Sequence, residues 1–98
     1  SIHLAAVFAC NFVNHCYAMA AEILEQHGMN FDVMLPLIDE TARKVHQLHP
    51  LDAQTGPAIR YDENVIRHHA QLLHDHPFMK DLYERLSLHI HRKAEQHD

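Results

Sequence analysis

The stretch IHLAAVFACNFVNHCYAMAAEILEQ, residues 2–26, decides the fold that this sequence predicts. It is predicted to form one long helix, because apolar residues recur on one face at helical spacing and the opposite side is largely apolar as well. A helix that is apolar all round belongs in an interior, so we expect this helix to be buried. The first face comprises Ile2, Ala5, Ala9, Phe12, Cys16, Ala20 and Ile23, and the opposite side carries Val7, Phe8, Cys10, Tyr17 and Ala21.

The residues after this helix predict three shorter helices. Gly28 suits the left-handed position that ends the first helix, with Met29 folding back on Leu24. Asn30 is the expected N-cap of a second helix that continues to about residue 48 and that Pro36 should kink or restart. Its inner stripe is predicted to be Met34, Leu37, Ile38, Thr41, Val45 and Leu48.

Two further helices are expected in the second half of the chain. Asp62 is the expected N-cap of a third helix over about 63–74, and Pro77 suits the first position of a fourth. The polar tail, residues 91–98, is expected to fray. The inward residues are predicted to be Val65, Ile66, His69, Leu72 and Leu73 in the third helix, and Phe78, Leu82, Leu86 and Ile90 in the fourth.

These elements predict an all-α fold, a four-helix orthogonal or bundle-like single domain over residues 1–98, built on one long buried N-terminal helix. No strand pattern occurs in the sequence. Three short helices are too few to enclose the long one. The surplus apolar surface therefore predicts a second subunit, a missing domain, or both.

Length, charge and cysteine content exclude several classes of protein. The chain has 98 residues, which fits one domain. Its formal net charge of -5 argues against nucleic acid as a partner. The start lacks the basic region of a signal peptide, and no apolar run reaches the roughly 20 residues that span a bilayer, so no membrane role is expected. Cys10 and Cys16 lie on different turns of one helix, so no disulfide and a reducing cytoplasm are expected.

One long loop, DAQTGPAIRYD at residues 52–62, interrupts the helices. Its aliphatic residues and isolated Arg60 indicate a packed loop, and packed loops often carry function. Gly56 permits a positive φ or close approach of another backbone, and Pro57 stiffens the residues after it. The guanidinium of Arg60 suits a phosphate or a carboxylate. In the alternative, Arg60 pairs with Asp62 or Glu63 and the loop is purely architectural. The partner against which the loop packs is expected to lie outside this chain.

Polar residues on the first helix form a second candidate site. Asn11, Asn14 and His15 interrupt the apolar surface, and Asn11 and His15 share a face. Buried polar groups need partners, so these residues either bond to neighbouring backbone or to a symmetry mate, or line a cleft and touch a ligand. Both interpretations remain open.

The twelve histidines raise the possibility of a metal site, but their spacing does not favour one. The pairs two apart, such as His74 and His76, point in different directions on a helix. No His-Glu-x-x-His or Cys-x-x-Cys motif occurs, so no metal ligands are predicted. The sequence also lacks a Gly-x-Gly-x-x-Gly or P-loop motif, so this chain cannot cradle a nucleotide by itself. Cys10 and Cys16 are expected to be small apolar core residues.

Two motifs resemble a known family: HLAAVFACNF at residues 3–12 and AQTGPAIRYD at residues 53–62. They are similar to the helical C-terminal domain of Rossmann-like proteins that carry a domain of unknown function. The resemblance covers everything except the polar tail. It implies a fold like the dimerisation domains of 6-phosphogluconate dehydrogenase-like and pyrroline-carboxylate reductase-like enzymes. It also implies an N-terminal dinucleotide-binding domain that is absent from this chain, with the active cleft between the two domains.

The sequence departs from the related dehydrogenases at one position. The resemblance implies a catalytic Lys four residues before an Asn on the first helix, but here Val7 precedes Asn11 at that spacing. Another group must then move the proton, with His3 and His15 as the candidates, or the family does not run that reaction. Asn11 is a further candidate for the catalytic site.

The leading hypothesis is a dimerising C-terminal domain of an NAD(P)-dependent oxidoreductase of unknown substrate, inactive as a fragment. Its cleft residues are predicted to be Asn11, Thr55, Gly56, Pro57 and Arg60, with His15 beside them. No cofactor is expected in this fragment, and NAD(P) is expected in the full-length protein. The alternatives are a purely structural homodimerisation module and a His-rich metal- or haem-binding domain.

Overall fold

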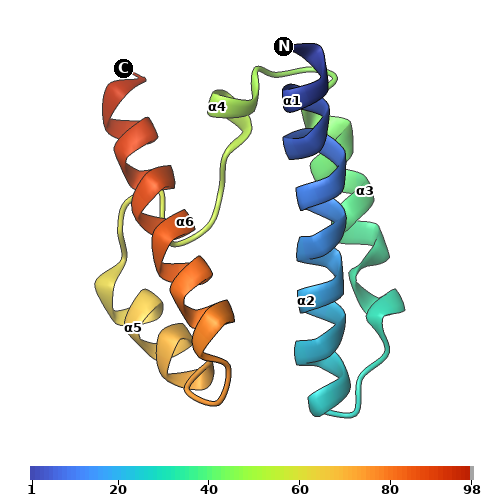
Figure 1. Ribbon diagram of the computed structural model, residues 1–98. Helices are drawn as coiled ribbons and strands as arrows, with labels where there is room; N and C mark the ends of the chain where they lie inside the picture. Colours follow the sequence, from blue (N-terminus) through green and yellow to red (C-terminus); the bar gives the residue numbers. More distant parts are fainter. Residues whose placement is uncertain (98) are drawn as a thin grey trace. The chain divides into compact units, whose positions relative to one another are not determined.

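The computed structural model describes residues 1–97, and all of its regular structure is helical (Figure 1). The predicted all-α class is therefore confirmed. The chain divides into two compact units, Ser1–Thr41 and the part that begins at Ala42, which are described separately. In chain order the elements are α1 (Ile2–Ala6), η1 (Val7–Phe12), α2 (Val13–Gln26), η2 (Phe31–Met34), α3 (Leu35–Lys44), α4 (Pro50–Ala53), α5 (Glu63–Leu72) and α6 (Pro77–Gln96).

The first unit is dominated by the predicted long helix, which runs unbroken from Ile2 to Gln26. Its segment η1 is a π-helix, a feature that the sequence analysis did not anticipate. A π-helix bonds each residue to the one five positions away, so it shifts the register of the faces that a regular α-helical spacing predicts. The apolar faces assigned from the sequence therefore do not continue straight through residues 7–12.

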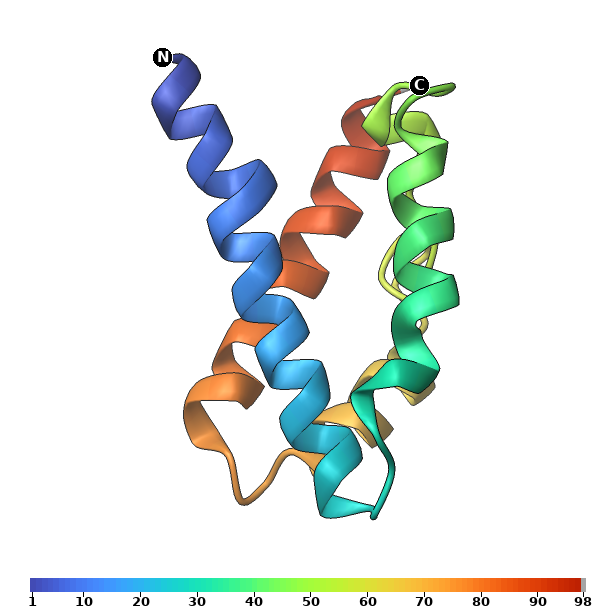
Figure 2. The same cartoon turned by 90° about the vertical axis from the view of Figure 1, so that its right-hand side faces the viewer.

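The turn after the long helix forms as predicted. Gly28 adopts a φ of 71°, and its N–H donates to the carbonyl of Glu25 at 3.1 Å. Met29 N–H donates to the carbonyl of Leu24 at 2.9 Å. These two bonds complete the Schellman arrangement that satisfies the last carbonyls of the helix. The chain then reverses into the second arm of a helical hairpin (Figure 2).

The second arm begins at the predicted N-cap. The side chain of Asn30 accepts a hydrogen bond from Asp32 N–H at 2.8 Å. The first turn is a 3-10 helix, and the α-helix begins at Leu35, next to Pro36. The expected restart at this proline is confirmed. The helix ends at Lys44 rather than near residue 48.

The predicted inner stripe of the second helix is only partly buried. Met34 and Ile38 are half-buried, as expected. The other members are exposed, because the 3-10 turn changes the helical phase and the helix stops before the last two positions. The exposed members are Leu37, Thr41, Val45 and Leu48.

The first helix is not buried, which corrects the prediction. Phe8 is 61% exposed, Phe12 is 51% exposed, and Leu24 is the one buried residue in α2. Cys10 and Cys16 are free and exposed, so they do not serve as core residues here. The reason is the small size of the unit, because one short arm cannot cover a helix of 25 residues.

The same helix is long and apolar enough to cross a membrane, judged by length and composition only. The expectation that no apolar run reaches spanning length is therefore wrong by this measure. The core helix of a soluble protein passes the same test. The finding therefore identifies a helix whose apolar surface requires a packing partner, and it does not identify that partner.

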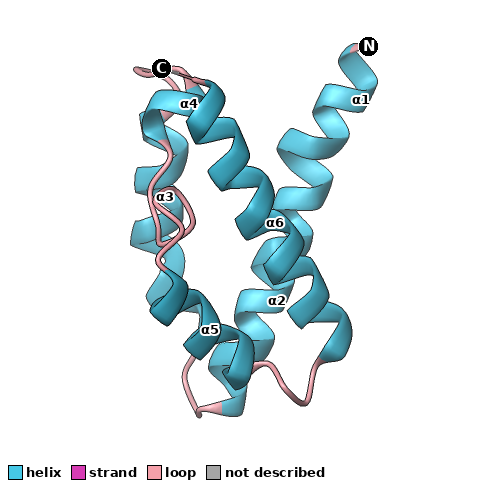
Figure 3. Ribbon diagram, turned by 90° about the vertical axis from the view of Figure 1, so that its left-hand side faces the viewer, coloured by secondary structure: helices cyan, strands magenta, loops and turns pink. Residues whose placement is uncertain are grey.

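The second unit contains the helical hairpin of α5 and α6 and the loop that leads into it (Figure 3). The carboxylate of Asp62 accepts from Val65 N–H at 3.3 Å and caps α5, as predicted. Pro77 occupies the first turn of α6, also as predicted. The side chains that are buried in this unit are Ala58, Ile66, Ala70, Leu73 and Ser87.

Several inward positions in this unit were predicted wrongly. Leu72 is 62% exposed and Phe78 is 91% exposed, while Leu86 is 44% exposed. Leu72 lies at the end of α5, and Phe78 lies in the first turn of α6, where no neighbouring helix covers either of them.

The tail and the start of the loop are more helical than the sequence suggested. Residues 91–96 continue α6 instead of fraying, and Pro50–Ala53 form the short helix α4. His91 and Ala94 are half-buried, and this packing holds the last turns of α6. Basic residues Arg92 and Lys93 also favour the C-terminal end of a helix. Asp98, the last residue of the predicted tail, lies outside the described residues.

Candidate functional site

The loop at residues 54–62 packs against α6 of its own unit. The Nδ1–H of His91 donates to the carbonyl oxygen of Ile59 at 3.2 Å, and the rings of Tyr61 and His91 lie 5.3 Å apart. Ala58 is 6% exposed. The predicted packing of the loop is confirmed. The expectation that its packing partner lies outside the chain is wrong, because the C-terminal half of α6 supplies that partner.

Two residues of the loop have a positive φ. Gly56 adopts 103°, which only glycine tolerates readily, and Tyr61 adopts 51°. The backbone is closed by Tyr61 N–H to Ala58 carbonyl at 3.0 Å and by Asp62 N–H to Pro57 carbonyl at 2.9 Å. A bulky residue in the left-handed region costs on the order of 1–3 kcal/mol and persists only where its surroundings enforce it. Such strain is concentrated at functional sites.

The structure brings the predicted loop residues together. Thr55, Gly56, Pro57 and Arg60 all line one open hollow of about 420 Å³. Arg60 is exposed, and it forms no ion pair with Asp62 or Glu63 among residues 1–97. The alternative in which Arg60 pairs with these carboxylates is therefore not what the structure contains. The remaining lining residues are Gln54, Ile59 and Asp62.

The candidates on the first helix belong to the other unit. His3, Asn11 and His15 are exposed, and Asn11 lies inside the π-helical segment. These three therefore do not share a unit with the loop residues. Asn11 and His15 are both open to solvent within this chain, so they are not enclosed in an interior of their own unit. The alternative in which they bond to a symmetry mate stays a prediction. π-Helical segments often occur at functional sites.

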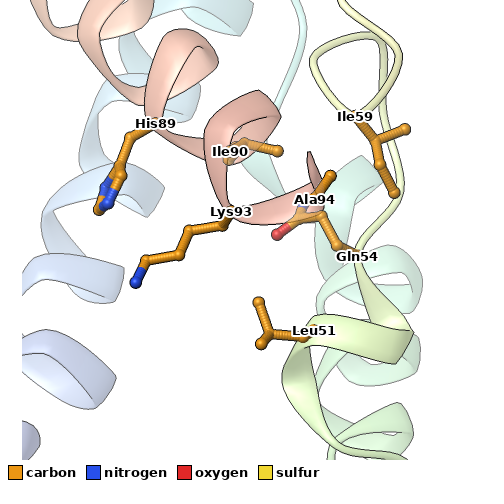
Figure 4. Close-up of a pocket in the computed structure, with 7 residues that line it drawn as sticks. All are labelled: Leu51, Gln54, Ile59, His89, Ile90, Lys93 and Ala94. Atoms are coloured by element: carbon orange, nitrogen blue, oxygen red, sulfur yellow. The ribbon is translucent and has the colours of Figure 1, made fainter. Parts of the chain in front are cut away.

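A second, smaller pocket shares Gln54 and Ile59 with the hollow that Arg60 lines (Figure 4). It has a volume of about 110 Å³, and α4, the loop and the C-terminal half of α6 contribute to it. Sequence reasoning missed this pocket, because Lys93 fell in the tail that was expected to fray and His89 was one of many scattered histidines. Its lining residues are Leu51, Gln54, Ile59, His89, Ile90, Lys93 and Ala94.

A half-buried polar cluster joins α5 to α6. His69 Nδ1 lies 2.8 Å from the hydroxyl of Tyr83, which also contacts Ser87. Burial raises the pKa of the Tyr83 phenol above its usual value, and the hydrogen bond with Ser87 partly opposes this. The cluster explains why His69 faces inward, as predicted, and it fixes the two helices in register.

Within the part of the chain that the structure describes, no three His, Cys, Asp or Glu side chains converge so that they could hold a metal ion. Several histidines instead have specific partners. His97 Nε2 lies 2.6 Å from Asp52 Oδ1, and His74 Nε2 lies 3.2 Å from Asp75 Oδ1.

The sequence matches the family model for a domain of unknown function, DUF2520, over residues 1–90. This chain belongs to that family. The match covers both motifs on which the resemblance rested, and the family assignment is thereby confirmed. No curated protein matches the sequence.

A solved structure is similar to this member of the family. It is the crystal structure of a protein from Bacteroides fragilis titled "putative NADP oxidoreductase", and it is 67% identical with a TM-score of 0.93. The match covers 94% of this chain and 36% of that chain, so this sequence spans only about a third of that protein's length. The long first helix, the loop and α6 are thus part of a shared fold, in a protein with a large further portion.

Proposed function

We propose that this chain is the C-terminal domain of an NAD(P)-dependent oxidoreductase and forms one wall of its interdomain cleft. The observation that carries the proposal is the 67% identity to a protein named as an NADP oxidoreductase, of which this chain covers 36%. The remainder of such a protein is where we place the dinucleotide-binding domain. The name of that relative supports NADP over NAD.

The hollow beside the loop fits an anionic group. Arg60 supplies a guanidinium that forms no ion pair with the neighbouring acids, and guanidinium binds phosphate or carboxylate in a bidentate manner. A Cβ built on Gly56 meets nothing within 4 Å, so a ligand has room to approach the backbone. Thr55 adds a hydroxyl that can donate or accept a hydrogen bond. The bound cofactor would donate or accept the hydride, while these residues would bind and orient the anionic part of the cofactor or substrate.

Proton transfer is assigned to the first helix. Val7 stands where the resemblance implies a lysine, so His3, Asn11 and His15 remain the candidates for a polar group at the reacting atoms. Their exposure in this chain leaves them open to a facing domain or to the second copy that we propose below. A fragment of this kind has no phosphate-binding loop and should be catalytically inactive by itself.

We also propose that the first helix pairs with the same helix of a second copy. Ile2 is 89% exposed, Leu4 57% and Phe8 61%, and such a continuous apolar surface is rare on a monomer. The family resemblance favours a second copy of this chain as the partner that buries this apolar surface. Two exposed free thiols, Cys10 and Cys16, suit a reducing cytoplasm.

The dimer is tested by sedimentation equilibrium of this chain without detergent. A stable dimer at micromolar concentration is the expected result. A monomer would refute the dimer, and a chain that stays in solution only with detergent or lipid vesicles would favour a membrane as the partner of the apolar surface.

The cofactor assignment is tested by titrating NADPH into the full-length protein in a calorimeter, where the absence of binding would refute it.

A purely structural dimerisation module is the second candidate. It is favoured by one observation, that the loop packs against its own α6 and so does not need a ligand to hold its conformation. This candidate predicts that substitutions of Arg60 have no effect on ligand binding or turnover by the full-length protein.

A further inference from the structure

We propose that the pocket between α4, the loop and α6 binds a short aliphatic carboxylate, with the hydrocarbon tail inside and the carboxylate on Lys93. The site lies within the second unit and is separate from the hollow that holds Arg60, although Gln54 and Ile59 line both. The proposal concerns binding alone and does not depend on the redox function.

The floor of the pocket is apolar. The side chains of Ile59 and Ile90 point toward it from the loop and from α6, and Leu51 closes it from α4 (Figure 4). A cavity of about 150 Å³ in another protein admits benzene, so a volume of about 110 Å³ has room for about four carbon atoms. Burying a tail of that size contributes favourable free energy at each methylene.

The rim of the pocket is cationic. Lys93 and His89 are one turn apart on α6 and both line the pocket, and Figure 4 shows their side chains extending from the same side of α6. No acidic residue lines the pocket, and Lys93 forms no ion pair within residues 1–97. The charge of the rim therefore favours an anion, and the small volume of the pocket favours a short apolar part. A carboxylate with a small branched chain combines both features.

Contacts within the second unit hold the walls of the pocket against one another. The His97 ring joins α6 to α4 through its 2.6 Å contact with Asp52, and it stacks on His49 at 6.2 Å. His91 joins α6 to the loop at Ile59. These contacts tie both α4 and the loop to α6, so neither segment can close over the pocket without breaking one of them. A preformed site needs less ordering on binding.

The experiment titrates isovalerate into the full-length protein without NADPH and follows the methyl signals of Leu51, Ile59 and Ile90 by NMR. We expect saturable binding at millimolar concentration, with isoamyl alcohol, which has the same tail and no charge, binding at least tenfold more weakly. We expect acetate, which lacks the tail, to be weaker than isovalerate as well.

Two variants locate the site. Lys93→Met keeps the length of the side chain and removes its charge, and it should weaken isovalerate binding about tenfold. Arg92→Met removes a neighbouring exposed charge on the same helix and is the matched control, with no expected change. Ala94→Leu fills the pocket and should abolish the shifts of the three methyl signals while the circular dichroism spectrum stays unchanged.

The proposal is overturned if isovalerate causes no shift in the full-length protein, since another part of that protein would then cover the pocket. It is equally overturned if the alcohol binds as well as the acid, or if Lys93→Met and Arg92→Met behave alike. The cofactor assignment survives each of these results, because the NADPH titration tests it separately.

Discussion

The first helix and the loop of the second unit were both expected to be packed against something, and they differ in what covers them. The loop is covered by α6 of its own unit, through His91, while most of the first helix has no cover in its own unit. An apolar composition shows that a segment needs cover, and it does not show where the cover comes from. The comparison places the uncovered apolar surface on the first helix and the proposed ligand hollow on the loop.

The largest expected effect is on the first helix. Phe8→Glu places a charge in the proposed dimer interface, where Phe8 and Phe12 also form an edge-to-face pair at 4.9 Å. An unpaired charge in an interface core costs several kcal/mol, so we expect the dimer to weaken by more than about 100-fold. Sedimentation equilibrium measures this. Asn64→Glu on the exposed side of α5 is the control, and an equal loss there would contradict the proposed interface.

Arg60→Ala tests the loop without touching the interface. The loss of a charge-assisted hydrogen bond costs about 1.5–3 kcal/mol, which corresponds to roughly 10- to 150-fold weaker NADPH or substrate binding. Calorimetry on the full-length protein measures it, and dimerisation should not change. Arg67→Ala, an exposed arginine on α5, is the matched control. Unchanged ligand binding in Arg60→Ala would support the structural module instead.

Substitutions of His91 can remove and restore the hydrogen bond that holds the loop against α6. His91→Ala leaves the Ile59 carbonyl without its donor and should lower stability by about 1–2 kcal/mol. His91→Asn keeps an N–H close to the Nδ1 position and should recover most of this loss. Hydrogen exchange at the Tyr61 and Asp62 amides should speed up in the alanine variant alone. Equal exchange in both variants would show that the hydrogen bond does not hold the loop.

The two glycines compare the units directly. Gly28 at φ 71° and Gly56 at φ 103° both lack neighbours near a built Cβ, so the cost of alanine comes from the backbone and is about 1 kcal/mol or more at each. Denaturant melts should show similar losses. Ligand binding should fall only in Gly56→Ala, and a fall in Gly28→Ala as well would argue that the two units are not functionally distinct.

The smallest effect concerns Tyr83 and alkaline pH. Because burial raises the folded-state pKa of the phenol above 10.0, the folded state holds this proton more tightly than the unfolded chain. The resulting stability is present below pH 10 and is lost as the pH rises from there through the raised pKa. Tyr83→Phe should remove this dependence. A melt series from about pH 9 to pH 11 measures it, and identical slopes in both proteins would contradict the assignment.

Most of the helices could be predicted from local chemistry. The Schellman turn at Gly28 and the caps at Asn30 and Asp62 were each evident from one or two residues. The π-helix and the helical tail could not be predicted in this way. The first is a register change without a side-chain signature, and the second depends on tertiary contacts of His91 and Ala94.

The part of the candidate site whose residues are close in sequence could be predicted, and the part that combines distant segments could not. The four loop residues that line one hollow are neighbours in sequence, so their grouping followed from the motif. The pocket with Lys93 combines three segments that are up to about 40 residues apart, and only the packing of α6 brings them together. Asn11 belongs to a different unit, and no local pattern can relate it to the loop.

The central claim is that the loop faces the cofactor side of a cleft in a larger protein. A crystal structure of the full-length protein with NADPH bound tests it most directly. The account predicts that Arg60 and the backbone at Gly56 lie within hydrogen-bonding distance of the cofactor or of the substrate anion beside it. A bound cofactor remote from the loop, with Arg60 still open to solvent, would contradict it.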